Sequence, residues 1–277
     1  MPYRLLALDV DGTLLDGRGE LRPRIVRAIA RAAEAGIRPV LCTGRRYRRA
    51  RPIGELLGMN SPLVCNSGAL VKEPSTGLTL WRADFSPALL ASILSVFHER
   101  GEDSVAFVDR IEGDWDFVIS KESTGRESFD EYVRLNRPHA RIDPAWTSHS
   151  DPYFHVCAVG DRVAMQQFEA LLLNRLGGAI RTFVQKSPAY SGTMCEVLRT
   201  DASKWSAVLH VAELWGVDPS EICAIGDDMN DLPMIAGAGL GVAMANAPAR
   251  IREAADHVTL GNDEDGVAVF IESVLLA

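Results

Sequence analysis

The chain has 277 residues, of which 47% are hydrophobic and 24% charged, and its net charge is −8 at pH 7. This composition is typical of a globular protein, and the length is sufficient for two domains. The negative net charge argues against general nucleic-acid binding. No apolar run reaches the roughly 20 residues of a membrane helix. Five widely spaced cysteines predict buried, reduced thiols, and no signal segment opens the chain, so we expect a cytoplasmic protein.

The apolar run from Leu5 to Leu8 predicts a buried strand, and two acids, Asp9 and Asp11, follow it. Because side chains alternate along a strand, both carboxylates would point the same way if the extension continued, while Gly12 allows a tight turn. Paired carboxylates at a strand end suit Mg²⁺. One could stay ionised as a nucleophile while the other carries a proton as general acid. In isolation, the pattern is more often an ordinary turn.

Pro23 and the helical spacing of the apolar residues after it predict a helix over 23–36, and the apolar run that follows predicts a second strand over 37–42. The order strand, helix, strand indicates parallel strands. Thr43 therefore lies, like Asp9, at the carboxyl end of a parallel strand, where ligands bind in open α/β sheets. Its hydroxyl, followed by glycine and a helix, could donate to a phosphate oxygen or serve as a helix N-cap. Arg45, the arginine nearest this edge, could reach an anionic substrate.

A third strand, over 63–65, again precedes small polar residues, Asn66-Ser67-Gly68-Ala69. From about Asp84 the rhythm changes. We expect helices over 87–100, 129–135 and 163–176, and strands over 105–108, 115–119, 154–159, 180–185 and 194–198, the first two joined across Glu112-Gly113. That order is typical of a separate α+β unit. We predict an α/β core, discontinuous over 1–83 and 200–277, with an α+β domain inserted over 84–199.

The parallel pattern resumes with a helix over 202–215 and a strand over 221–225, which runs directly into Asp227 and Asp228. A short helix, a strand and two further helices follow, over 232–236, 240–242, 247–254 and 266–276. Two acidic strand ends far apart in sequence meet only if their strands are neighbours, in which case Asp227 joins the two acids after the first strand in one Mg²⁺ site. Lys204 could neutralise the nucleophile and a transferring phosphoryl group. By itself it would more often be a surface lysine.

These motifs together resemble the haloacid-dehalogenase (HAD) superfamily, and more narrowly its Cof-type (class IIB cap) sugar phosphatases, over the whole chain. The four motifs that match are, in order, Asp9-Val10-Asp11-Gly12-Thr13, Thr43-Gly44-Arg45, Lys204 and Gly226-Asp227-Asp228-Met229-Asn230-Asp231. Trp205 departs from the family, which often has glycine after the lysine. The resemblance implies a Rossmann-like parallel-sheet core with an inserted α+β cap of the C2 type, which carries substrate specificity.

The resemblance also implies the residue roles. Asp9 is the nucleophile that forms an aspartyl-phosphate, and Asp11 protonates the leaving group and then activates water. The phosphoryl group is held by residues of the second, third and fourth motifs: Thr43, Gly44, Lys204 and Asn230. Mg²⁺ is held by the Asp9 carboxylate, the Asp11 main-chain carbonyl and Asp227, while Asp231 orients the lysine or the phosphate.

The predicted function is Mg²⁺-dependent hydrolysis of small phosphorylated metabolites of the sugar-phosphate kind, with no nucleic-acid or membrane partner. One alternative is a phosphomutase or phosphotransferase that uses the same aspartate. The other is a non-catalytic, phosphate-responsive binding module, against which Asp11 argues because a phosphate-accepting switch needs no acid–base group beside it. The sequence identifies neither the physiological ester nor the oligomeric state.

Overall fold

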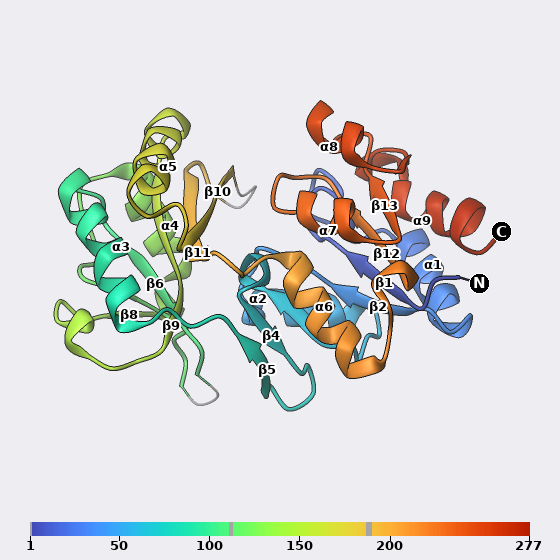
Figure 1. Ribbon diagram of the computed structural model, residues 1–277, viewed down its shortest axis with the longest axis horizontal. Helices are drawn as coiled ribbons and strands as arrows, with labels where there is room; N and C mark the ends of the chain where they lie inside the picture. Colours follow the sequence, from blue (N-terminus) through green and yellow to red (C-terminus); the bar gives the residue numbers. More distant parts are fainter. Residues whose placement is uncertain (1, 111–112, 187–189) are drawn as a thin grey trace. The chain divides into compact units, whose positions relative to one another are not determined.

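A computed structural model describes residues 2–110, 113–186 and 190–277 (Figure 1). The chain divides into two compact units, which we call the core unit (Met1–Trp81 with Ser203–Ala277) and the cap unit (Arg82–Ala202). The sequence predicts these boundaries two residues later, at 83/84, and three residues earlier, at 199/200. Within the described residues, no helix combines the length and the apolar character needed to cross a membrane.

The core unit is built on a parallel sheet. Its strands in spatial order are β14 (His257–Val258), β13 (Leu240–Ala243), β12 (Ile222–Gly226), β1 (Leu5–Leu8) and β2 (Arg38–Leu41). The central strand β1 has parallel neighbours on both sides, with Leu8 opposite Ile225 of β12 and Leu41 of β2. This register brings the carboxyl ends of three strands from distant parts of the sequence to one edge of the sheet.

Helices bury the faces of this sheet, which explains why its strands are continuous apolar runs in the sequence. The core-unit helices are α1 (Pro23–Glu34), α2 (Tyr47–Leu56), α6 (Lys204–Trp215), α7 (Leu232–Gly237), α8 (Ala249–Ala254) and α9 (Gly266–Phe270). All of β1 is fully buried. On one face, Leu5 and Ala7 pack in a cluster with Val208 and Val211 of α6. The predicted final helix ends early, because a π-helical turn over Ile271–Leu275 replaces its second half.

A second, smaller sheet of the core unit contains β3 (Leu63–Cys65), β4 (Leu70–Lys72) and β5 (Thr79–Arg82). The strands β4 and β5 were not predicted, because they are short and β5 is only partly buried, so neither has a clear period-two pattern. β3 pairs antiparallel with β4. A single bridge between Cys42 and Val64 connects β3 to the end of β2.

The cap unit is a largely antiparallel sheet packed against helices. Its strand order is β10 (Ile180–Lys186), β11 (Thr193–Arg199), β9 (Tyr153–Gly160), β6 (Val105–Val108), β7 (Phe117–Ile119) and β8 (Ala140–Ile142), and its helices are α3 (Pro87–Arg100), α4 (Glu127–Asn136) and α5 (Arg162–Leu176). The rings of Phe97 (α3) and Phe168 (α5) meet edge to face at 4.8 Å in its core. An α/β core with an inserted α+β unit confirms the predicted fold class.

Two details of the cap unit differ from the sequence analysis. Strand β7 begins at Phe117, two residues later than predicted, and β8 lies in a stretch for which no strand is predicted. The predicted join between β6 and β7 includes Glu112, which is outside the described residues. Within the sheet, His155 is buried and stacks on Phe107 at 4.5 Å, and burial lowers its pKa to about 3.

Candidate active site

The end of β1 places Asp9 against β12. The Asp9 N–H donates to the carbonyl of Ile225 at 3.0 Å, so the ladder between the two strands extends past the apolar run. The Asp9 side chain is buried, although no apolar strand would by itself favour a carboxylate there. Asp9 therefore depends on nearby cations and donors, and the structure supplies them from the last third of the chain.

Asp227 directly follows β12 and lies against the turn after β1. The Thr13 hydroxyl donates to Asp227 Oδ1 at 2.8 Å. Gly12 has a φ of +82°, and a Cβ at this position would fall 2.2 Å from Asp227 Oδ2. Only glycine combines this left-handed backbone with such a close approach. Gly12 and Thr13 of the first motif thus allow the turn after β1 to contact Asp227 of the fourth motif.

Lys204 connects two of the acidic residues. As the first residue of α6 it is 1% exposed, and its Nζ donates to Asp9 Oδ1 and to Asp231 Oδ1, both at 2.6 Å. Burial acts to lower the pKa of Lys204, but the carboxylates of Asp231 and Asp9 outweigh burial and raise it. Lys204 is therefore a buried ammonium, not the surface lysine of the alternative interpretation.

Asp231 also organises the loop after β12. Its second oxygen, Oδ2, accepts hydrogen bonds from the backbone N–H groups of Asp227 at 2.9 Å and Asp228 at 3.0 Å. A Cβ at Gly226 would fall 2.5 Å from the Asp231 side chain, which explains the glycine before the two acids. Both Asp231 oxygens are thus engaged, one by Lys204 and one by the loop backbone.

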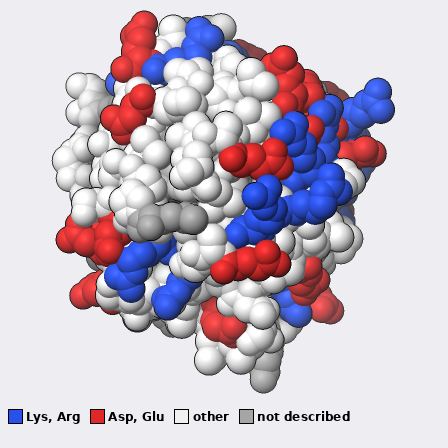
Figure 2. Space-filling model, turned by 90° about the vertical axis from the view of Figure 1, so that its right-hand side faces the viewer, with Lys and Arg blue, Asp and Glu red and all other residues white. Residues whose placement is uncertain are grey.

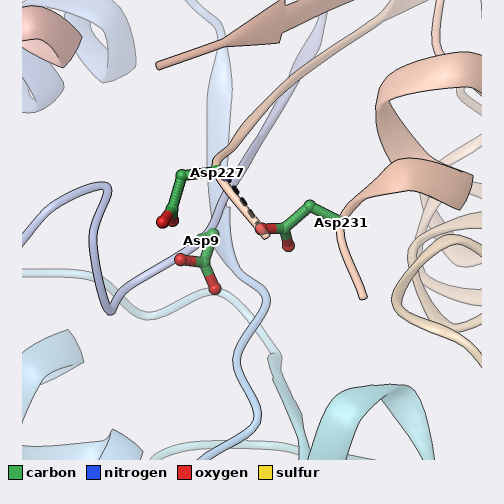
Figure 3. A group of neighbouring side chains, drawn as sticks. All are labelled: Asp9, Asp227 and Asp231. Carbon is green, nitrogen blue, oxygen red and sulfur yellow. Dashed lines mark hydrogen bonds between the residues drawn. The ribbon is translucent and has the colours of Figure 1, made fainter. Parts of the chain in front are cut away.

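Asp9, Asp227 and Asp231 form an acidic cluster in which one oxygen of each lies within 4.8 Å of the others (Figure 3). Burial, followed by repulsion from Asp231, raises the pKa of Asp9 to about 7. Burial, followed by repulsion from Asp9, raises the pKa of Asp227 to about 9. When ionised, these carboxylates carry more negative charge than Lys204 neutralises. Their oxygens are ligands suited to a hard divalent cation, which would stabilise the ionised forms. Because the oxygens of Asp231 are engaged, Asp9 and Asp227 are the carboxylates suited to hold one.

The Asp11 carboxylate lies outside this cluster and pairs with Arg45. The Arg45 Nε and Nη2 donate to its two oxygens at 2.7 and 2.6 Å, in the parallel fork that arginine makes with carboxylates. Both side chains are about one-third exposed. The predicted main-chain role of Asp11 toward a metal stays a prediction, and Arg45, expected near an anionic substrate, contacts the predicted acid–base residue.

Thr43 and Asn230 lie at the ends of their predicted elements. Thr43 is buried after β2, and its Oγ1 accepts from the Arg45 N–H at 3.1 Å, which stabilises the turn before α2. That helix takes Arg46 as its N-cap, so Thr43 is not the cap of the alternative interpretation. Gly44 follows in the same turn. Asn230 is buried, and its Nδ2 donates to the Ser67 hydroxyl at 3.4 Å.

Trp205, the one departure from the family pattern, packs between two helices. A Cβ at Gly237 would fall 2.5 Å from Cε2 and Nε1 of the Trp205 ring. The absence of a side chain at Gly237 therefore lets the indole bring α6 against α7. This contact joins the helix that begins at Lys204 to the helix that Asp231 precedes.

Two further residues belong to this site, although the sequence pattern assigns no individual role to either. The Thr13 hydroxyl, part of the first motif, donates to Asp227. The Asn246 Nδ2 donates to the Gly12 carbonyl at 2.9 Å. Asn246 closely follows a predicted apolar parallel strand, as Asp9 does, and this position is the sequence signal that indicates it.

Comparison with known proteins agrees with this geometry. A family model described as haloacid dehalogenase-like hydrolase matches residues 6–271. The pyridoxal phosphate phosphatase of Escherichia coli is 26% identical over 293 residues, covering 100% of both chains. The 5-amino-6-(5-phospho-D-ribitylamino)uracil phosphatase of Bacillus subtilis is 28% identical over 275 residues, covering 99% of this chain and 96% of that one. A solved haloacid dehalogenase-like hydrolase from Bacteroides thetaiotaomicron superposes with a TM-score of 0.79 at 29% identity, covering 98% of this chain and 99% of that one.

Proposed function

Because the chain belongs to the haloacid dehalogenase-like hydrolases and is a phosphatase of their Cof type, we propose that it hydrolyses small phosphate monoesters with Mg²⁺, through an aspartyl-phosphate on Asp9. The family membership confirms the resemblance drawn from the sequence. The observation that supports the mechanism best is the buried Lys204, whose Nζ lies 2.6 Å from a carboxylate oxygen of Asp9 and of Asp231. The raised pKa of the Asp227 carboxyl supports the same site.

In the first step, a carboxylate oxygen of Asp9 attacks phosphorus. The bond from Asp9 to phosphorus forms as the bond to the ester oxygen breaks. Lys204 holds Oδ1 of Asp9, so Oδ2 is the oxygen suited to attack. The ammonium also offsets negative charge on the phosphoryl oxygens, which the Thr43 hydroxyl and the Gly44 backbone can contact. Phosphoryl transfer needs chiefly this kind of positioning and charge neutralisation.

Asp11 is the acid–base residue of the proposal. It gives a proton to the leaving alkoxide and then takes one from the water that hydrolyses the phospho-enzyme, restoring Asp9. Arg45 holds both oxygens of Asp11 in this structure. At least one of those hydrogen bonds must therefore be exchanged for the leaving-group oxygen when an ester binds.

Mg²⁺ would be held by the Asp9 and Asp227 carboxylates and the Asp11 carbonyl. When bound, it supplies positive charge toward the phosphoryl oxygens and keeps neighbouring carboxylates ionised. The raised pKa values of Asp9 and Asp227 support this assignment, because burial and repulsion between carboxylates disfavour the ionised forms that a bound cation would stabilise.

Small metabolites are the proposed substrates, and the cap unit is the proposed specificity domain. Relatives named as phosphatases of pyridoxal phosphate and of a ribitylaminouracil phosphate support this class. The net charge of −8 disfavours nucleic acid, and on the face shown in Figure 2 Lys and Arg side chains lie beside Asp and Glu. A cytoplasmic location is part of the same proposal.

The test is phosphate release from a panel of sugar, polyol, pyridoxal and flavin-precursor phosphates, with Mg²⁺ and with chelator. We expect Mg²⁺-dependent release that Asp9→Asn lowers on the order of 10⁴-fold, as for other catalytic groups. The matched control is Asp256→Asn, which alters a core-unit carboxylate whose one hydrogen bond within the described residues comes from the Gly241 N–H. Release that survives in chelator, or in Asp9→Asn, would refute the mechanism. Transfer of phosphate to an added alcohol in preference to water would instead favour a phosphotransferase.

A further inference from the structure

The turn after β3 has a conformation that its residues disfavour. Asn66 and Ser67 have φ values of +50° and +54°, in the left-handed region, and both are buried. Residues with a Cβ seldom adopt this region, least of all twice in succession. Such a backbone persists only where the surrounding structure holds it, and it is concentrated at functional sites. The function proposed above gives this turn no role.

Two backbone hydrogen bonds attach the turn to the loop after β2. The Asn66 N–H donates to the Arg45 carbonyl at 2.9 Å, and the Ser67 N–H donates to the Thr43 carbonyl at 3.1 Å. The turn therefore moves with the loop that carries the second motif.

On its other side, the turn contacts the start of α6. Gly68 has a φ of +94°, and a Cβ there would fall 2.1 Å from the carbonyl carbon and oxygen of Ser203 and 2.4 Å from the backbone nitrogen of Lys204. Ser203 is the N-cap of α6 and accepts a hydrogen bond from the Ser206 N–H. Gly68 thus lies directly against the capped helix end from which Lys204 extends.

Ser67 adds a contact to the fourth motif, since its hydroxyl accepts the hydrogen bond from Asn230 Nδ2 at 3.4 Å. One strained turn of three residues therefore contacts the loop of Thr43, the helix end of Lys204 and the side chain of Asn230. These three elements are distant in the sequence, and each carries a group assigned to the phosphate.

We propose that the turn Asn66–Gly68 fixes the distance between these phosphate-binding groups, with Ser67 and Gly68 as positioning residues for Asn230 and Lys204. The left-handed backbone is what allows the Ser67 hydroxyl and the bare Gly68 to face two different elements. The effect on catalysis rests on the proposed function, but the effect on Lys204 does not.

The first test is Gly68→Ala against Gly36→Ala. Gly36 has a similar φ of +88°, and no atom of the described residues lies within 4 Å of the place a Cβ would take, so its variant reproduces the backbone strain without the clash. We expect Gly68→Ala to lower kcat on the order of 100-fold, as for displacements of about 1 Å in a catalytic group. We expect Gly36→Ala to keep kcat within about twofold of the native chain.

A second readout does not need activity. The lysines of the chain are Lys72, Lys121, Lys186 and Lys204, and a buried, doubly paired ammonium should give a slowly exchanging side-chain NMR signal after ¹⁵N-lysine labelling. Lys204→Arg assigns it. We expect that signal to shift or lose protection in Gly68→Ala and to stay unchanged in Gly36→Ala.

If Gly68→Ala does not fold, Ser67→Ala decides the question. It removes only the hydroxyl that faces Asn230, and we expect a 3- to 10-fold loss of kcat, about that of one hydrogen bond. We also expect a shifted Lys204 signal, because Asn230 directly precedes Asp231, which pairs with Lys204. Its control is Ser273→Ala, which removes a hydroxyl bonded to the Val269 carbonyl. The proposal is overturned if the variants of the turn match their controls in both the NMR signal and kcat. A chain that releases no phosphate from any ester, yet shows the shifted signal, would refute the proposed function and leave this inference standing.

Discussion

The substitution Asp231→Asn tests whether one buried carboxylate holds the site together. Oδ1 of Asp231 faces the Lys204 ammonium and Oδ2 faces two backbone N–H groups, so both oxygens act as acceptors. An amide has one acceptor and one donor end. In one orientation its NH₂ faces the ammonium, and in the other it faces the N–H groups of Asp227 and Asp228. Asparagine therefore cannot satisfy both partners, although it has almost the same shape.

The expected cost follows from these contacts. Removing one partner of a buried ion pair destabilises a protein by about 3–5 kcal/mol. Lys204 keeps Asp9 as a partner, and loss of the Asp231 charge relieves repulsion that contributes to the raised pKa values of Asp9 and Asp227. Both effects reduce the loss, so we expect about 3 kcal/mol at pH 7.

The assay is urea unfolding followed by tryptophan fluorescence, because Trp205 and Trp215 lie on α6, next to the altered pair. Asp256→Asn is the control. This carboxylate accepts a hydrogen bond from the Gly241 N–H and contacts no lysine among the described residues, so we expect its loss to cost about 1 kcal/mol. Equal losses in the two variants would refute the reasoning, because the ion pair with Lys204 would then contribute nothing.

Three further predictions concern the same structure. Gly12→Ala should displace Asp227 and abolish Mg²⁺-dependent turnover. Gly19→Ala should retain it, because Gly19 has a φ of +78° and no atom of the described residues lies within 4 Å of a Cβ there; equal turnover in the two variants would contradict the close approach of Gly12 to Asp227. Titration of metal-free protein with Mg²⁺ at pH 7 should release between one and two protons, because the pKa of Asp227 is raised to about 9 and that of Asp9 to about 7; a pH-stat measurement without release would contradict the assignment. The pKa of His155 falls from 6.5 to about 3 on folding. The unfolded chain thus binds the extra proton, and stability should fall by about 1.4 kcal/mol per unit as the pH drops below 6.5, with His155→Asn showing a smaller slope in urea unfolding.

The sequence was most informative where function constrains local pattern. Asp9 and Asp227 each follow an apolar strand abruptly, and parallel topology requires such ends to share an edge. Lys204 could not be assigned from its local sequence, since a lysine at the start of a helix is usually exposed. Its burial results from Asp9 and Asp231, which approach it from two other elements.

The sequence pattern does not predict contacts between side chains that only the folded chain brings together. The fork between Arg45 and Asp11 requires a particular turn after β2. Strands β4 and β5 were missed because each is short and one is partly exposed. The left-handed φ of Ser67 left no local signal either, because serine in a turn is ordinary.

The charges of the site explain why its parts occur together. When ionised, Asp9, Asp227 and Asp231 carry three negative charges, and Lys204 carries one positive charge. Burial, together with this imbalance, raises the pKa values of Asp9 and Asp227, where proton binding lowers the negative charge. A nucleophilic Asp9 must instead be ionised, so the mechanism needs positive charge that Lys204 alone does not provide. A divalent cation would balance the remaining two charges, and a bound phosphate ester would then require the further donors on the neighbouring loops. The acidic cluster, the buried lysine and the small polar turns are thus successive consequences of placing a nucleophilic carboxylate at the end of a buried strand.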